Sequence, residues 1–231
     1  MTFTKSILIP CFNETQTIEE VIKRVENEIN INDEIIIIDD FSNDGTREKL
    51  KKIKKKNIKI IFLDKNLGKG NALKEGLKLS ENDIVIIQDA DLEYNPTDYK
   101  KLMLPFEEVN ADIVYGSRFM GTNKYVRVHL FLHFIANKLL TFLCNIFTNL
   151  NMTDMETGYK VFKKNVIKSI NLEEKSFGIE PEITIKLAKK KFRFFEVPIS
   201  YSGRNYNEGK KIGLKDAFRA VFCIFKYGIF K

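Results

Sequence analysis

The 231-residue sequence predicts an α/β fold in which a mostly parallel sheet carries helices on both faces. Three observations predict it. Short apolar runs recur through the first half of the chain, most of them are continuous rather than alternating, and segments with helical periodicity separate them. Continuous runs indicate strands buried on both faces, as in a doubly wound sheet. Ligands of such sheets bind beyond the carboxyl ends of the strands.

The expected strands follow one another at residues 6–10, 34–38, 58–63, 84–87 and 112–115. Between the first two, Thr17 and Glu20 have the spacing of a capping box, which predicts the start of a helix. Its apolar stripe is formed by Val21, Ile22, Val25 and Ile29.

Two later segments predict amphipathic helices at a membrane interface. Residues 136–150 place Lys138 and five Asn or Thr side chains on one arc and Leu, Ile and Phe on the other. A lysine central in a membrane span costs about 2.5 to 3.5 kcal/mol, so a helix lying at the interface is favoured. Packing against the domain's own core is the alternative. Residues 214–231 carry a narrow arc of basic residues (Lys215, Arg219 and Lys226) beside a wide aromatic face.

Composition excludes several classes of protein. With 44% hydrophobic and 30% charged residues, the chain is neither disordered nor an integral membrane bundle. Its three cysteines form no CxxC pair, which argues against a disulfide framework and a Cys-based zinc site. The first residues lack the pattern of a signal peptide, so we expect one cytoplasmic domain spanning residues 1–231.

The net charge of +7 comes from the last fifth of the chain. Residues 186–231 hold twelve Lys and Arg against three acidic residues, a net charge of +9. A solvated face, a phosphate-bearing ligand and an anionic membrane surface all explain such a segment. We expect no nucleic-acid partner, because aromatic and basic residues are not interleaved in a reading motif.

Acidic residues follow two of the expected strands. Asp89 and Asp91, separated by Ala90, enter the loop after residues 84–87, with Glu93 nearby. Paired carboxylates at such a position suit a divalent cation, because Mg²⁺ takes few carboxylates and fills its other positions with phosphate oxygens and water. A lone DxD also occurs by chance in surface loops.

Asp39 and Asp40 close the second strand. Carboxylates there commonly accept hydrogen bonds from a ribose or a base, although one of the two can cap the following helix. Gly68 and Lys69 lie in NLGKGNA, which opens a helix, so its backbone N–H groups and Lys69 can face a diphosphate. The basic loop at 203–211 offers Arg204, Lys210 and Lys211 to a phosphate, or is simply solvated.

The order of the motifs is more specific than any one of them. ILIPCFNE, IIIIDDFSNDGT, NLGKGNA, DIVIIQDADLEYNP and YGSR together resemble the family 2 glycosyltransferases, which have the Rossmann-like GT-A fold. DMETGYKVF and the segment from FGIEPEI to Phe218 look like the dolichol-phosphate mannose synthase branch, which includes bacterial polyprenyl-phosphate sugar transferases. The resemblance spans nearly the whole chain.

This resemblance implies a role for each matching position. Pro10, Phe12 and Glu14 would surround the nucleotide base, Asp40 would contact the base or ribose, and Asp89 and Asp91 would bind Mg²⁺ or Mn²⁺. Glu93 stands where the branch usually has Gln. Arg118 and Arg204 would lie near the diphosphate or the acceptor phosphate. Residues 1–120 would bind the nucleotide sugar, and residues 121–213 the acceptor.

The implied reaction is inverting transfer of a hexose from a GDP-mannose or UDP-glucose type donor to a polyprenyl (dolichyl or undecaprenyl) phosphate at the inner membrane face. A phosphate acceptor needs no general base, whereas an alcohol does, and Asp154 and Glu156 are the candidates. Transfer to a sugar hydroxyl in cell-envelope glycan assembly is therefore an alternative. A haloacid-dehalogenase phosphatase and a catalytically silent adaptor are more remote. Because the sequence stops at Lys231, we expect membrane contact through the amphipathic helices, a membrane-protein partner or a second copy.

Overall fold

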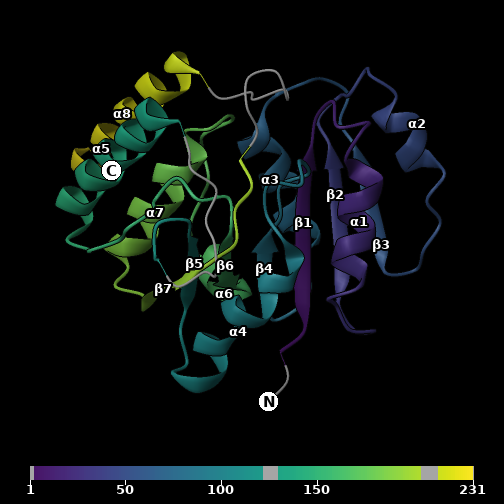
Figure 1. Ribbon diagram of the computed structural model, residues 1–231, viewed down its shortest axis with the longest axis horizontal. Helices are drawn as coiled ribbons and strands as arrows, with labels where there is room; N and C mark the ends of the chain where they lie inside the picture. The colour runs from purple at the N-terminus through teal and green to yellow at the C-terminus, as the bar shows by residue number, and fades with distance from the viewer. Residues whose placement is uncertain (1–2, 122–129, 204–212, 231) are drawn as a thin grey trace.

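Figure 1 shows the fold as a computed structural model that describes residues 3–121, 130–203 and 213–230. Seven strands form one sheet in the order β3-β2-β1-β4-β6-β5-β7. The strands are β1 (Lys5–Cys11), β2 (Glu34–Asp39), β3 (Ile58–Phe62), β4 (Ile84–Ile87), β5 (Ile113–Ser117), β6 (Lys160–Lys163) and β7 (Phe194–Pro198). The helices are α1 (Ile18–Glu26), α2 (Thr46–Lys51), α3 (Lys69–Leu79), the 3-10 helix η1 (Pro96–Asp98), α4 (Tyr99–Glu108), α5 (Phe131–Thr148), α6 (Lys164–Ile167), α7 (Ile179–Lys189) and α8 (Leu214–Ile229).

All five expected strands are confirmed, and the sheet is mostly parallel. β6 was not predicted; it runs antiparallel to both β4 and β5, between which it lies. Its four residues, KVFK, have a lysine at each end, so no apolar run marks it. β7 was also missed, because Glu196 and Pro198 interrupt its apolar pattern.

Each face of the sheet has its own apolar core. Alternate side chains of β1, such as Ile7 and Leu8, point to opposite faces, as strand geometry requires. α1, α2 and α4 cover the face of Ile7, and α3, α5, α6, α7 and α8 contribute to the core around Leu8. The expected arrangement of helices on both faces is therefore confirmed.

The predicted capping box at the start of α1 is wrong. Thr17 is the N-cap residue, yet its side chain makes no capping hydrogen bond. Its hydroxyl instead lies 2.7 Å from the carbonyl oxygen of Ala90, with the Glu14 carboxylate 2.8 Å away. Thr17 thus ties the loop after β1 to the loop after β4, a contact between segments 73 residues apart.

α5 and α8 lie side by side at one end of the molecule (Figure 1), where the rings of Phe147 and Phe225 meet edge to face. α5 starts five residues earlier than residues 136–150, the expected helix. Its polar arc faces inward: Lys138 donates to the carbonyl of Thr153, and Thr141 accepts from the backbone N–H of Met155. Among the described residues, α5 alone is long and apolar enough to cross a membrane by length and composition.

The outward faces of both helices are apolar. Phe142 on α5 is 61% exposed and Phe218 on α8 is 75% exposed. We call the exposed side chains of these helices and their flanks the apolar surface: Leu130, Phe131, Leu132, Ile135, Leu139, Phe142, Ile146, Phe218, Phe222, Phe225, Ile229 and Phe230. An exposed set this large on two adjacent helices is typical of a contact surface rather than of scattered surface residues.

Candidate active site

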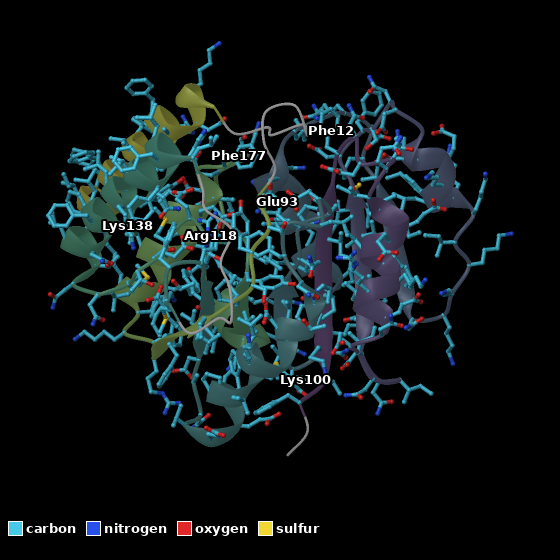
Figure 2. All side chains as sticks on the ribbon, viewed as in Figure 1. Phe12, Glu93, Lys100, Arg118, Lys138 and Phe177 are labelled. Atoms are coloured by element: carbon cyan, nitrogen blue, oxygen red, sulfur yellow. The ribbon has the colours of Figure 1, made fainter. Side chains whose placement is uncertain are left out.

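The carboxyl ends of the parallel strands open onto a cleft of about 730 Å³. In Figure 2, the labelled Phe12, Glu93, Arg118 and Phe177, all of which line this cleft, lie in the upper half of the molecule, whereas Lys100 lies at the opposite edge. Most of the predicted site residues line the cleft: Pro10, Phe12, Glu14, Asp40, Gly68, Lys69, Asp89, Ala90, Asp91, Glu93, Arg118 and Glu156. Arg204, Lys210 and Lys211 lie outside the described residues.

Asp39 and Asp40 have different roles. Asp39 is fully buried 2.9 Å from Nε of Arg47, whose guanidinium carbon lies 5.4 and 5.2 Å from the ring centres of Phe41 and Phe62. It does not line the cleft, so its predicted contact with the nucleotide is not supported. Asp40 does line the cleft, and its carboxylate accepts hydrogen bonds from the backbone N–H groups of Leu67 and Gly68 at 2.9 and 2.7 Å.

The glycines of NLGKGNA allow a close approach to the segment before α7. Gly68 has a φ of +94°, which favours glycine, and a Cβ there would lie 2.6 Å from the carbonyl oxygen of Lys175. A Cβ on Gly70 would collide with the carbonyl of Glu174. The backbone N–H of Asn71 donates to the carbonyl of Lys175 at 3.0 Å. Sequence alone did not reveal this neighbour, because it lies more than 100 residues downstream.

Lys69, the first residue of α3, is held by two carboxylates. Its ammonium nitrogen lies 2.8 Å from Oδ1 of Asp89 and 3.0 Å from Oε1 of Glu180. Burial would lower the pKa of Lys69, but these two carboxylates raise it above its ordinary value. The other oxygen of Glu180 binds Lys160, which is fully buried in β6. Burial would raise the pKa of Glu180, and the two lysines hold it below its ordinary value.

The acidic pair after β4 suits a divalent cation. The carboxylates of Asp89 and Asp91 supply hard oxygen ligands at the cleft, and Gly158 leaves room for Asp89, since a Cβ there would collide with Oδ2. Among the described residues, no three His, Cys, Asp or Glu side chains are grouped closely enough to hold a metal ion. This fits a cation that completes its shell with diphosphate and water. Bound there, it would stabilise negative charge on the leaving phosphate.

Glu93 is joined to the opposite wall of the cleft. Its carboxylate accepts a hydrogen bond from the hydroxyl of Tyr201 at 2.7 Å, and its carbonyl accepts from the backbone N–H of Ser202 at 2.9 Å. Tyr201 follows β7, so this contact links the DxD loop to the end of the last strand. The carboxylate of Glu93 thus already has one hydrogen-bond donor, as that of Asp89 has an ion-pair partner in Lys69.

Arg118 and Asp154 form a buried pair beside the cleft. The Asp154 carboxylate accepts from the backbone N–H, Nε and Nη2 of Arg118 at 3.0, 2.7 and 2.8 Å. Burial would raise the pKa of Asp154, but Arg118 holds it below its ordinary value. Asp154 does not line the cleft. Asp154 is therefore poorly suited to act as a general base, the role that the sequence suggested for it. Its hydrogen bonds instead position Arg118.

Glu156 differs from Asp154. It lines the cleft, and its Oε1 is buried with no hydrogen-bond partner among the residues that the structure describes. Burial and the nearby Glu180 raise the pKa of Glu156 to about 7. A carboxyl group with a pKa near the working pH can accept or release a proton there. Of the two candidate bases, Glu156 alone has the environment that general-base catalysis requires.

Comparison with known proteins agrees with this geometry. The family model of glycosyl transferase family 2 matches residues 6–170, from β1 through α6 and beyond. The chain belongs to this family. Membership in glycosyl transferase family 2 argues against the phosphatase alternative.

Two relatives match most of this chain. A dolichol-phosphate mannosyltransferase of Pyrococcus furiosus is 28% identical over 227 residues, which cover 96% of this chain and 64% of that protein. An uncharacterized protein of Methanocaldococcus jannaschii is 29% identical over 84% of this chain and 86% of its own length. The chain thus spans less than two thirds of the mannosyltransferase.

A solved structure shares the fold. Glucosyl-3-phosphoglycerate synthase from Mycobacterium tuberculosis, in complex with Mn²⁺, uridine diphosphate and phosphoglyceric acid, superposes with a TM-score of 0.76 at 18% identity. The match covers 99% of this chain and 80% of that one. A further structure of that enzyme holds Mg²⁺ and uridine diphosphate. The GT-A-like fold is therefore confirmed.

Proposed function

We propose that this glycosyltransferase moves a hexose, with inversion, from a nucleotide sugar to a polyprenyl phosphate at the inner face of the cytoplasmic membrane. One observation carries the proposal: the cleft continues from the acidic pair to the apolar surface. Leu132, Ala136 and Leu140 of α5 and Ala217 and Ala220 of α8 line the cleft together with His133, Asn137 and Asp216, and Leu132 also belongs to the apolar surface. An acceptor that is ionic at one end and isoprenoid at the other suits such a cleft. The mannosyltransferase relative supports this acceptor class.

The residues supply the chemistry of such a transfer. The sugar leaves through an oxocarbenium-like transition state while negative charge grows on the departing diphosphate. Lys69 and the cation on Asp89 and Asp91 would stabilise that charge. Arg118 contributes the positive charge of its guanidinium at the cleft, where Asp154 holds Nε and Nη2 in place, and this charge favours a phosphate nearby. An acceptor phosphate is already ionised, so it attacks without a base.

Membrane contact would rest on α5 and α8. The apolar surface is the larger contribution, because two of the three cations expected at the bilayer, Arg219 and Lys226, bind the carboxylate of Glu174. Lys215 remains exposed. The proposed location is peripheral, on the cytoplasmic side, with a partner protein or a second copy as further occupants of the same surface.

A screen of donors and acceptors tests this function. GDP-mannose and UDP-glucose are each incubated with a short-chain polyprenyl phosphate and Mn²⁺, and the lipid products are resolved by mass spectrometry. A hexosyl phosphoprenol is expected from one donor. Glycosylation of sugar hydroxyls with no reaction at the phosphate would contradict the acceptor while leaving the donor site intact.

A sugar hydroxyl is the second candidate acceptor, and Glu156 favours it. An alcohol needs a base to take its proton, and Glu156 lines the cleft with a raised pKa and a buried oxygen that no described residue hydrogen-bonds. The structurally similar synthase was solved with phosphoglyceric acid rather than a lipid. Free sugars and glycan fragments therefore belong in the same screen.

A further inference from the structure

Lys69 forms an ion pair with Asp89, one of the two carboxylates that would bind the metal. Its ammonium lies 2.8 Å from Oδ1 of Asp89, which is direct ion-pair contact. A divalent cation on the same oxygen would sit a few ångströms from this positive charge. Because like charges at that separation repel strongly inside a protein, the two cations compete for Asp89.

Asp89 itself has little freedom to serve both. Oδ1 faces Lys69, and Oδ2 lies so close to Gly158 that a Cβ there would collide with it. The carboxylate is thus confined between α3 and the loop before β6. Of the two partners, the flexible lysine side chain is the one that can move.

Glu180 provides a second anchor for Lys69. Oε1 of Glu180 lies 3.0 Å from the ammonium nitrogen of Lys69. Glu180 stands in the first turn of α7 and is almost fully buried. Its other oxygen is bound to Lys160, whose ammonium also lies 4.9 Å from the ring centre of Tyr115. Because Lys160 fixes Glu180 from behind, the contact between Glu180 and Lys69 can persist when Asp89 is taken by another cation.

We infer that Lys69 is a positioning residue that competes with the divalent cation for Asp89, and that Glu180 retains Lys69 when the cation binds. The ammonium is then held beside the cation instead of on its ligand, where it faces the diphosphate. The inference rests on the donor site of the proposed function and is independent of the acceptor. The affinity of the site for the metal then depends on Lys69 of α3 and Glu180 of α7 as well as on the DxD loop.

Binding of Mn²⁺ to the full chain without nucleotide tests the inference, with free Mn²⁺ measured by electron paramagnetic resonance. Lys69→Met removes the competing charge, so Mn²⁺ is expected to bind roughly tenfold more tightly. Lys186→Met is the matched control. Lys186 also bridges two carboxylates, at 3.3 Å from Glu173 and 2.6 Å from Glu182, but lies outside the cleft, and the affinity should not change.

The role of Glu180 needs its own variant. Glu180→Gln alone would leave Lys160 buried without a charge partner, so it is combined with Lys160→Met, which removes the pair together. Asp89 is then the one remaining carboxylate that pairs with Lys69 among the described residues. The ammonium should hold Asp89 more firmly, and Mn²⁺ binding is expected to weaken several-fold. Thermal melts report whether each variant folds, and general damage would weaken binding in every variant, whereas the inference requires a gain in Lys69→Met.

Unchanged or weaker Mn²⁺ binding in folded Lys69→Met would overturn the competition, as would the absence of Mn²⁺ binding to both the wild type and this variant. Unchanged binding in the Glu180 and Lys160 double variant would overturn the retention by Glu180. None of these measurements involves an acceptor. Failure to glycosylate polyprenyl phosphate would therefore refute the proposed acceptor and leave the inference standing, and successful transfer with unaltered metal affinities would do the reverse.

Discussion

Asp154 accepts three hydrogen bonds from Arg118 and thereby fixes a guanidinium at the wall of the cleft. Asp154→Asn should lower the free energy of unfolding by about 3 kcal/mol, because Arg118 would remain buried without a charge partner. Measurable turnover should remain, with a raised KM for a phosphate acceptor. Urea unfolding and initial rates measure the two effects.

Asp112→Asn is the control for this pair. Asp112 binds Arg193, whose side chain is half exposed, and Lys163, so Asp112→Asn should leave no cation buried without a partner and should cost less than Asp154→Asn. Complete loss of turnover in Asp154→Asn with normal stability would contradict the positioning role and restore Asp154 as a base.

Asp91 is predicted to be essential for catalysis but not for folding. Asp91→Asn removes one of two carboxylates for the cation, so turnover should fall at least about 100-fold, while the thermal melt stays close to wild type. Asp64→Asn, at an exposed position after β3, is the control and should retain full activity. Full activity of Asp91→Asn, or of the wild type in excess EDTA, would refute the metal role.

The strands of the first half were predictable because continuous apolar runs leave few alternatives for a parallel sheet, and the DxD pair was predictable because it follows such a run. Contacts between distant segments were not. Glu180 holds Lys69, and Lys160 holds Glu180; both lie in segments that carry the family resemblance, DMETGYKVF and FGIEPEI, but no sequence pattern shows which charges pair across them. Likewise, Asp39 and Asp40 are adjacent in the sequence, but the sequence does not show that Arg47 forms its ion pair with Asp39.

The amphipathic helices show the same limit. The sequence separated polar from apolar side chains on residues 136–150, but periodicity does not say which arc faces the protein. Hydrogen bonds from Lys138 and Asn145 to the carbonyls of Thr153 and Met152 turn the polar arc inward. Glu174, nearly fully buried, does the same for the cations of α8.

The apolar surface is predicted to bind bilayers. Phe142→Ser combined with Phe218→Ser should weaken binding to liposomes at least roughly tenfold, since burying one phenyl group contributes about 1.5 to 3 kcal/mol. Liposome flotation measures the change. These substitutions test the surface more cleanly than deletion of α8, because Cys223 and Tyr227 of that helix belong to the core.

Ile31→Ser is the control, because Ile31 is 94% exposed in the loop before β2 and does not belong to the apolar surface. Salt should weaken binding only slightly, because Glu174 pairs with Arg219 and Lys226, and Glu173 pairs with Lys226 as well. Flotation that is insensitive to both phenylalanines would contradict a membrane role for α5 and α8.

Glu156 should make stability depend on pH. Its pKa is raised from an ordinary 4.5 to about 7, so between these values the folded protein binds more protons than the unfolded chain. Stability should therefore fall as pH rises from about 5 to 7, by on the order of 2 kcal/mol. Glu156→Gln should flatten this slope in urea titrations at several pH values.

Glu174→Gln is the contrasting variant. Burial would raise the pKa of Glu174, but its bonds to Arg219, Lys226 and Tyr227 lower it to about 2. Its contribution is present above the ordinary pKa and is lost only as pH falls toward 2. The variant should be less stable at every pH from 5 to 7 yet keep the wild-type slope. A wild-type slope in Glu156→Gln would place the titrating group elsewhere.

Turnover by Glu156→Gln separates the two acceptor classes. If the acceptor is a phosphate, the nucleophile is already ionised, and the amide should retain measurable turnover with at most roughly tenfold loss. If the acceptor is a sugar hydroxyl, loss of the base should reduce kcat by about 100-fold or more.

Because a phosphomonoester itself titrates near pH 6, a pH profile of the wild type alone cannot assign the group. The decisive measurement is the ratio of wild-type to Glu156→Gln rates across pH 5.5 to 8.5. With a phosphate acceptor this ratio should stay constant, whereas with a hydroxyl acceptor it should rise with pH until it levels off above about 7, where Glu156 is ionised.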